Sequence, residues 1–237
     1  MSLGPKRSQM ISYLINSLFV GLLALTGPRL SASTGDPAAA RMDEIQALYS
    51  SIQFNESERP DSAMFHQGIE GFQHLRSSNQ LSDKEIIALV DFTKPSSEKR
   101  MWIIDLRNRK VLYYLLVAHG KNSGELYATS FSNKPNSYQS SLGIFTTGDI
   151  YNGKNGKSLK LHGRQKELNG LAEQRSIVIH GADYVSDAFV KRVGRLGRSY
   201  GCPAIPMEVH DEVIDLLAGG NLLFIYSPGP SVNLALR

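Results

Sequence analysis

The spacing of hydrophobic residues changes along the chain, and this change predicts two structural regions. In the N-terminal part, four apolar residues recur every three or four positions, the spacing of one face of an α-helix: Phe65, Ile69, Phe72 and Leu75. Further along, the apolar runs become short and turn residues separate them, which is typical of β-strands. The pattern predicts a helical N-terminal region over 41–82, packed on a domain over 83–237 that is mainly β with helical additions.

Seven short apolar runs are the expected strands. They cover residues 86–92, 100–106, 111–118, 143–147, 158–161, 176–179 and 222–226. The first run could instead be helical, because Ser82-Asp83-Lys84-Glu85 resembles a capping box. We favour a strand, since the run is short and is followed by Lys94-Pro95. The charged turn over 107–110 makes the second and third runs a hairpin.

Two helices are expected late in the chain. Ser186 is a suitable N-cap for a short helix that ends near Arg192. Pro206 suits the first position of a second helix, which Gly219 would end. The apolar face of this second helix comprises Val209, Val213, Leu216 and Leu217.

The N-terminus predicts export. Lys6 and Arg7 precede the apolar run 11–25, and the small residues of 30–32 follow it. This order is typical of a signal peptide over 1–32, and the run is short for a membrane span. The alternative is an anchor that is not cleaved. Cleavage would leave a flexible linker over 33–40 and no stable membrane span.

Composition and charge narrow the possible partners. The chain is 41% hydrophobic and 20% charged, as expected of a globular protein. Its net charge of +4 suits a polyanionic neighbour such as cell wall or lipid head groups. No arginine-rich run or basic aromatic stripe is present, which argues against nucleic acid.

The chain contains one cysteine, Cys202. Exported proteins reside in oxidising compartments, where cysteines usually pair, so an unpaired one is inert, intermolecular or reactive. Inert cysteines are typically buried in apolar segments. Cys202 lies between Gly201 and Pro203 in an expected loop, which favours a reactive thiol.

A cysteine nucleophile needs a base, a group that orients the base, and donors for an oxyanion. His180 ends an expected strand and is the best candidate base, and the carbonyl of Gly181 would fix its tautomer. Ser199 would brace the cysteine loop through its hydroxyl. The backbone N–H groups of the loop would form the oxyanion hole: Tyr200, Gly201 and Cys202.

These residues resemble a known pattern. His180-Gly181 followed by Ser199-Tyr200-Gly201-Cys202 is similar to the signature of the YkuD-like L,D-transpeptidases, in which H-G precedes S-H-G-C. Residues 140–145 stand where that family has T-P-x-G-x-F. Further segments look like the murein L,D-transpeptidase subfamily: 117–124, 131–135, 180–184 and 201–204. The resemblance covers about residues 84–226 and leaves out the helical N-terminal region.

Three positions depart from that pattern. Tyr200 replaces a histidine, Ser141 replaces a proline, and Ala204 stands where the family commonly has an arginine. Another cation must then serve the site, and Arg195 and Arg198 are the candidates.

The resemblance implies a β-sandwich-like catalytic domain for acyl transfer on peptidoglycan stem peptides. Cys202 would attack the diaminopimelate carbonyl of a tetrapeptide, D-Ala would leave, and an amine acceptor would form a 3→3 cross-link. No metal or organic cofactor is implied, and carbapenems would acylate Cys202. Because no wall-anchoring module is evident, the Gram-negative periplasm is favoured over the cell wall of other bacteria.

Substrate contacts and alternatives remain open. His119 would line the substrate cleft or brace its loop, and Tyr184 and Arg198 are further candidate substrate contacts. The closest alternative function is an L,D-carboxypeptidase or another peptidoglycan hydrolase or amidase. A non-catalytic wall-binding protein is more distant. A zinc site is also conceivable, although its ligands lack metal-binding spacing: His119, His162, His180 and Cys202.

Overall fold

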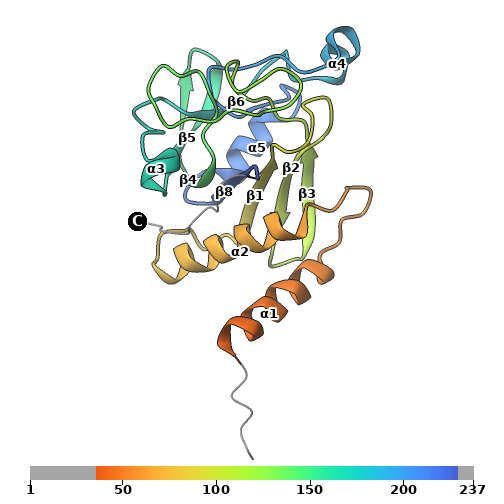
Figure 1. Cartoon of the computed structure of the whole chain (residues 1–237), viewed down its shortest axis with the longest axis vertical. Coiled ribbons are helices and arrows are strands. Elements are labelled where there is room, and N and C mark those ends of the chain that lie inside the picture. Colours follow the sequence, from red (N-terminus) through yellow and green to blue (C-terminus); the bar gives the residue numbers. More distant parts are fainter. Residues whose placement is uncertain (1–35, 229–237) are drawn as a thin grey trace, which may run out of the picture. The chain divides into compact units, whose positions relative to one another are not determined.

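The computed structural model describes residues 36–228, and its strands form one eight-stranded sheet (Figure 1). The strands are β1 (Ile86–Asp91), β2 (Met101–Asp105), β3 (Lys110–Leu115), β4 (Gly143–Gly153), β5 (Gly156–Gly163), β6 (Val178–Gly181), β7 (Ala204–Ile205) and β8 (Leu222–Tyr226). Their order in the sheet is β3-β2-β1-β8-β4-β5-β6-β7. The pairs β1–β8 and β6–β7 are parallel, and the other neighbouring pairs are antiparallel.

The sequence predicted seven of the eight strands: β7 was not expected, and β6 lies two residues later than the expected run 176–179. The first run is a strand, and β2 and β3 form the expected antiparallel hairpin. The strands β4 and β5 extend beyond the expected ranges because they continue as a hairpin to the Gly153–Gly156 pair.

The N-terminal region contains two helices, α1 (Pro37–Ser51) and α2 (Ser62–Ser77), where one continuous helical region was expected. Residues 52–61 separate the two helices. Asp61 marks the start of α2, because its side chain caps the helix by accepting a hydrogen bond from the Met64 N–H. Asp36 caps α1 in the same way, so the expected linker 33–40 is helical from Pro37 onward.

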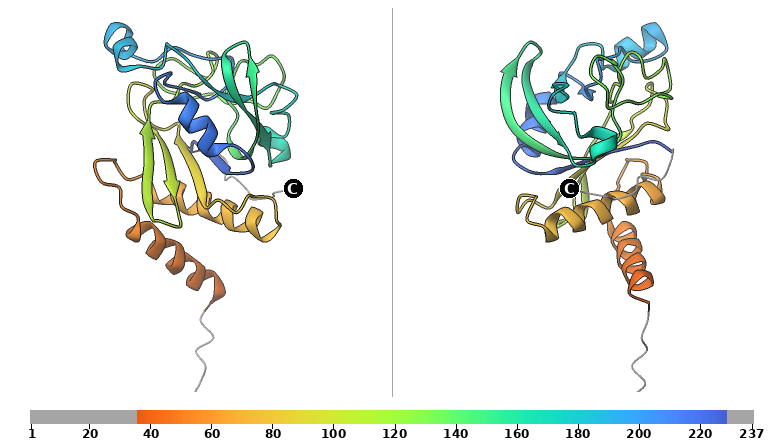
Figure 2. Two further views of the ribbon diagram at one scale, coloured as in Figure 1. Left: turned by 180° about the vertical axis from the view of Figure 1, so that it is seen from behind. Right: turned by 60° about the vertical axis from the view of Figure 1, so that its left-hand side comes forward.

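The sheet is covered on both faces. On one face, α1 and α2 pack on alternate strand residues such as Ile87 and Leu89. Gly68 and Gly71 let α2 approach the sheet closely. A Cβ on Gly68 would lie 2.7 Å from the Leu89 side chain, and a Cβ on Gly71 would lie 2.2 Å from the Ile144 side chain. Figure 2 shows these helices and α5 (His210–Leu217) on opposite sides of the β1–β3 strands.

The second core joins both halves of the sheet around α5. It contains side chains of β1–β3, of β4–β6 and of α5, among them Val90, Leu159 and Val213. The two halves therefore pack like the layers of a sandwich, as expected for the fold class.

The two late helices differ in how well they were predicted. Ser186 caps α4 (Asp187–Val193) through the Phe189 N–H, as expected. The second helix, α5, begins at His210 and not at Pro206, because the chain first turns between Pro206 and Val209.

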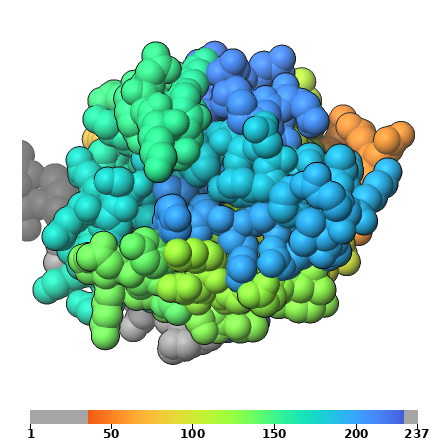
Figure 3. Space-filling model, turned by 90° about the horizontal axis from the view of Figure 1, so that it is seen from above, coloured from red at the N-terminus to blue at the C-terminus, as the bar shows by residue number. Residues whose placement is uncertain are grey.

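The remaining connections bring the expected site residues to one edge of the sheet. Pairing of β6 with β7 aligns His180 with Ala204, two residues after Cys202. Gly120 forms a bridge with Ser199, so the segments around residues 120–140 and 180–205 lie side by side, green and blue in Figure 3. Within residues 36–228, no helix is long and apolar enough to cross a membrane. The expected signal peptide lies outside the described residues.

Candidate active site

Cys202 lies in the tight loop that leads into β7. Gly201 has a φ of 122°, which favours glycine, and a Cβ there would lie 2.7 Å from the Gln139 carbonyl oxygen. The Ser199 hydroxyl donates to the Cys202 carbonyl at 2.6 Å and accepts from the Gly201 N–H at 3.0 Å. Ser199 therefore braces the loop, as expected.

That second hydrogen bond corrects the expected oxyanion hole. The Gly201 N–H is already donated to Ser199 Oγ, so it does not point freely toward a bound substrate. Of the three expected donors, the N–H groups of Tyr200 and Cys202 are the ones left for this role.

His180 lies near the end of β6 and is only 4% exposed. Its Nδ1 lies 2.8 Å from the Gly181 carbonyl oxygen, as the sequence predicted. Since a carbonyl only accepts, Nδ1 carries the proton and Nε2 keeps its lone pair. Burial lowers the pKa of His180, although the Gly181 carbonyl opposes this shift. The imidazole is therefore a neutral, oriented base at neutral pH.

The Cys202 thiol is partly exposed and lies beside the segment that enters β6. Its Sγ donates to the Ser176 carbonyl oxygen at 3.6 Å. Burial raises the pKa of Cys202, whereas the Val178 N–H and the charge of Arg175 lower it. These two groups stabilise the thiolate.

Arg175 is the cation of the site, and the sequence analysis did not identify it. Its guanidinium donates to the carbonyls of Ser132 and Gln139, both at 2.6 Å, and to the hydroxyls of Ser137 and Ser141. Burial lowers the pKa of Arg175, and a negative charge on Cys202 raises it. This half-buried guanidinium holds the 132–141 loop against the cysteine loop.

A model of the L,D-transpeptidase catalytic domain matches residues 56–226. The chain belongs to this family. The match begins before α2, so the family's domain includes that helix, which the resemblance read from the sequence left out.

Solved L,D-transpeptidases resemble the chain at low identity. The enzyme from Mycobacterium smegmatis is 12% identical, with a TM-score of 0.38 over 61% of this chain and 59% of its own. L,D-transpeptidase 1 of Mycobacterium tuberculosis is 10% identical, with a TM-score of 0.35 over 61% and 62%. For that of Stackebrandtia nassauensis the values are 11% and 0.35, over 81% and 93%. The chain thus spans about three-fifths of the first two structures. No curated protein matches it.

Arg175 accounts for two of the three departures of this L,D-transpeptidase domain from the family pattern. Ser141, which replaces a proline, accepts a hydrogen bond from Arg175. Ala204 replaces the family's arginine, and Arg175 supplies a cation from another segment. The cations proposed from the sequence, Arg195 and Arg198, both pair with Glu125, at 2.9 and 2.6 Å.

His119 lies inside the domain and braces a loop. Its side chain is fully buried, its Nδ1 accepts from Arg100 at 2.9 Å, and its Nε2 donates to the Gly124 carbonyl at 3.2 Å. Its own carbonyl accepts from the Ser199 N–H at 3.0 Å. Of the two roles expected for His119, these contacts favour bracing over lining the cleft.

The other two expected substrate contacts differ from each other. Burial raises the pKa of Tyr184 to about 12, and the charge of the nearby Cys202 adds to this shift. Tyr184 is therefore a neutral phenol near the thiol. Arg198 is instead bound to Glu125 and to the carbonyls of Lys121 and Gly124. This contact set makes Arg198 a support of the neighbouring loop.

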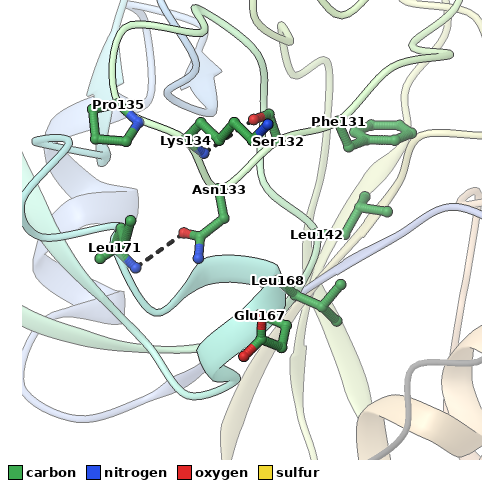
Figure 4. Close-up of a pocket in the computed structure, with 9 residues that line it drawn as sticks. All are labelled: Phe131, Ser132, Asn133, Lys134, Pro135, Leu142, Glu167, Leu168 and Leu171. Atoms are coloured by element: carbon green, nitrogen blue, oxygen red, sulfur yellow. Dashed lines mark hydrogen bonds between the residues drawn. The ribbon is translucent and has the colours of Figure 1, made fainter.

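Two cavities are lined by neighbours of the site residues, and Cys202 and His180 line neither of them. One of about 240 Å³ is lined by Ser176 and Val178, the residues that contact Cys202 Sγ, and also by Tyr151. Another of about 430 Å³ lies between the 131–135 segment and the 167–171 segment, and neither Cys202 nor His180 lines it (Figure 4). There Asn133 accepts a hydrogen bond from the Leu171 N–H at 3.0 Å.

The zinc alternative finds no support in the geometry. Residues 36–228 contain no group of three or more side chains arranged to hold a metal ion. His119 contacts Arg100, and His162 lies 3.4 Å from Glu173.

His119 makes acid stability a testable property of this loop. Burial and the charge of Arg100 lower its pKa to about 4 from 6.5. Between pH 6.5 and about 4, His119 binds a proton in the unfolded chain but not in the folded one. The free energy of unfolding therefore falls by about 3 kcal/mol as the pH falls through this window. Urea unfolding at pH 7 and pH 4.5 measures the loss.

The matched variants are His119→Gln and His162→Gln, the latter at a partly exposed histidine. His119→Gln should reduce the pH dependence, and His162→Gln shows what the loss of a histidine elsewhere does to the same measurement. Titration of the His119 ring by NMR gives a second readout if His119→Gln does not fold. A pKa near 6.5 would contradict the prediction.

Proposed function

We propose that the domain is a cysteine-dependent L,D-transpeptidase acting on peptidoglycan. The observation that carries this proposal is the imidazole of His180, oriented by Gly181 at 2.8 Å, on the strand next to the Cys202 loop. Cysteine nucleophiles need a base that a third group orients, and His180 meets that requirement. Family membership supports the reaction class.

The proposed first step forms a thioester. His180 Nε2 takes the thiol proton, and Cys202 Sγ attacks the carbonyl carbon at the L-centre of diaminopimelate in a tetrapeptide stem. The N–H groups of Tyr200 and Cys202 stabilise the oxyanion. When the C–N bond to D-Ala breaks, the protonated His180 returns its proton to the leaving amine.

The proposed second step releases the enzyme. An amine of another stem loses a proton to His180 and attacks the thioester carbon, so a C–N bond forms and the C–S bond breaks. Cys202 regains its proton, and the product is a 3→3 cross-link. Water in place of the amine gives a tripeptide, which is the L,D-carboxypeptidase alternative.

The resting charges suit this proton transfer. Burial favours the neutral forms of both Cys202 and His180, so the proton moves when the thiol attacks. Arg175 lowers the cost of the transient negative charge on sulfur. We also propose that the protein is exported, that its site is the Gram-negative periplasm, and that carbapenems acylate Cys202.

The test uses the protein without residues 1–32 and disaccharide-tetrapeptides, analysed by mass spectrometry. Cross-linked dimers are expected, with loss of one D-Ala per cross-link, and heat-inactivated protein is the control. Tripeptide without dimer would favour the carboxypeptidase. Unchanged tetrapeptide from the folded protein would overturn both and favour a different wall bond or binding alone.

A further inference from the structure

Lys121 lies between two exposed tyrosine rings beside the Cys202 loop. Its Nζ is 4.4 Å from the ring centroid of Tyr138 and 4.5 Å from that of Tyr200. The rings themselves are 5.0 Å apart and inclined by 52°. Tyr200 is 65% exposed, so its ring is accessible to a ligand.

Backbone hydrogen bonds fix this arrangement relative to the thiol. The Lys121 N–H donates to the Ser199 carbonyl at 2.8 Å, and the Asn122 N–H donates to the Tyr138 carbonyl at 3.2 Å. Tyr200 precedes Cys202 by two residues, so their Cα atoms are at most about 7 Å apart. The Lys121 cluster thus draws on three separate segments, one of which carries Cys202.

The cations near the Cys202 loop are only partly paired. Among residues 36–228, Lys121 forms no ion pair, and Glu125 is shared by Arg195 and Arg198. With Arg175 behind the loop, the neighbouring cations outnumber the carboxylate that pairs with them. This surface favours an anionic ligand.

We propose that Lys121, oriented by Tyr138 and Tyr200, binds a free carboxylate of the stem peptide. The inference rests on the proposed function and names a contact that orients its substrate. The rings of Tyr138 and Tyr200 hold the Lys121 ammonium in place. Its N–H groups are the donors that this cluster offers to a ligand. A charge-assisted hydrogen bond of this kind contributes about 10-fold or more to affinity.

The test measures binding separately from turnover. Calorimetry gives the Kd of a tetrapeptide stem for Cys202→Ala protein, with and without Lys121→Met, which keeps an apolar chain between the rings and removes the charge. A Kd weakened by about 10-fold or more is expected, and Lys121→Arg should recover most of it. Lys99→Met is the matched control, because Lys99 stacks on Tyr114 of β3, 5.7 Å from the ring centroid.

Two amidated peptides identify the carboxylate. If Lys121 binds the terminal D-Ala carboxylate, the peptide amidated there should have the same Kd for the proteins with and without Lys121→Met. If Lys121 binds the diaminopimelate side-chain carboxylate, the peptide amidated at that position should show this equality instead. Equal Kd values for the free peptide with and without this substitution, or no binding to either protein, would overturn the inference. Failure of the proposed function appears separately, as absence of turnover by the unsubstituted protein.

Discussion

Replacing Cys202 by alanine is expected to abolish covalent acylation of the protein. Incubation with a carbapenem should add one inhibitor mass to the unsubstituted chain, which has a single cysteine. The alanine variant has no sulfur to attack the lactam carbonyl, so the adduct should disappear. Cross-linking of tetrapeptides should fall by more than about a thousandfold in parallel, as for other removed nucleophiles.

A second substitution distinguishes chemistry from folding. Cys202→Ser replaces the thiol by a hydroxyl of similar size, but the pKa of the serine hydroxyl is too high for efficient attack at neutral pH. Both variants should unfold in urea at the same midpoint as the unsubstituted protein. An adduct that persists in the alanine variant would sink the assignment of Cys202 as the nucleophile.

Replacing Arg175 by methionine is expected to raise the pKa of the Cys202 thiol. Arg175 is a cation that stabilises the thiolate, so the thiolate becomes less favourable when this charge is removed. Less thiolate then exists at neutral pH, so alkylation by iodoacetamide should slow by about 10-fold. The pH dependence of the alkylation rate measures both quantities.

Two further variants separate the charge of Arg175 from its contacts with the 132–141 loop. Arg175→Lys keeps the charge and should restore most of the thiol pKa, although it cannot make all the hydrogen bonds of the guanidinium. Arg164→Met is the matched control, since Arg164 is also partly buried but donates to Thr146. An unchanged thiol pKa in Arg175→Met would show that Arg175 only holds the loop.

Local sequence predicted most of the elements. Short apolar runs between turns need only neighbouring residues to be recognised, so the hairpin of β2 and β3 followed from spacing alone. The same holds for the Ser186 cap of α4 and for the contact of His180 with the adjacent Gly181 carbonyl. Helix starts were less certain, as at α5, because a turn can precede the helix.

The sequence also indicated that a cation was missing. Ala204 in place of an arginine implied a replacement from elsewhere, and Arg175 does lie just before the strand that carries His180. Nothing local marked it, because its partners at 132, 137, 139 and 141 are distant in sequence. The roles of Arg195 and Arg198 were likewise decided by Glu125, which lies in another loop.

The sequence by itself therefore determined most of the strands and the family, and it proposed the pair of Cys202 and His180, since these depend on short-range spacing and on a compact motif. Only the tertiary structure decided the electrostatics of the site. It buried His119 against Arg100, brought Arg175 to the thiol and placed Lys121 between two tyrosines. The physical reason is that burial and charge act through space, between segments whose proximity is set by the folded sheet and its loops.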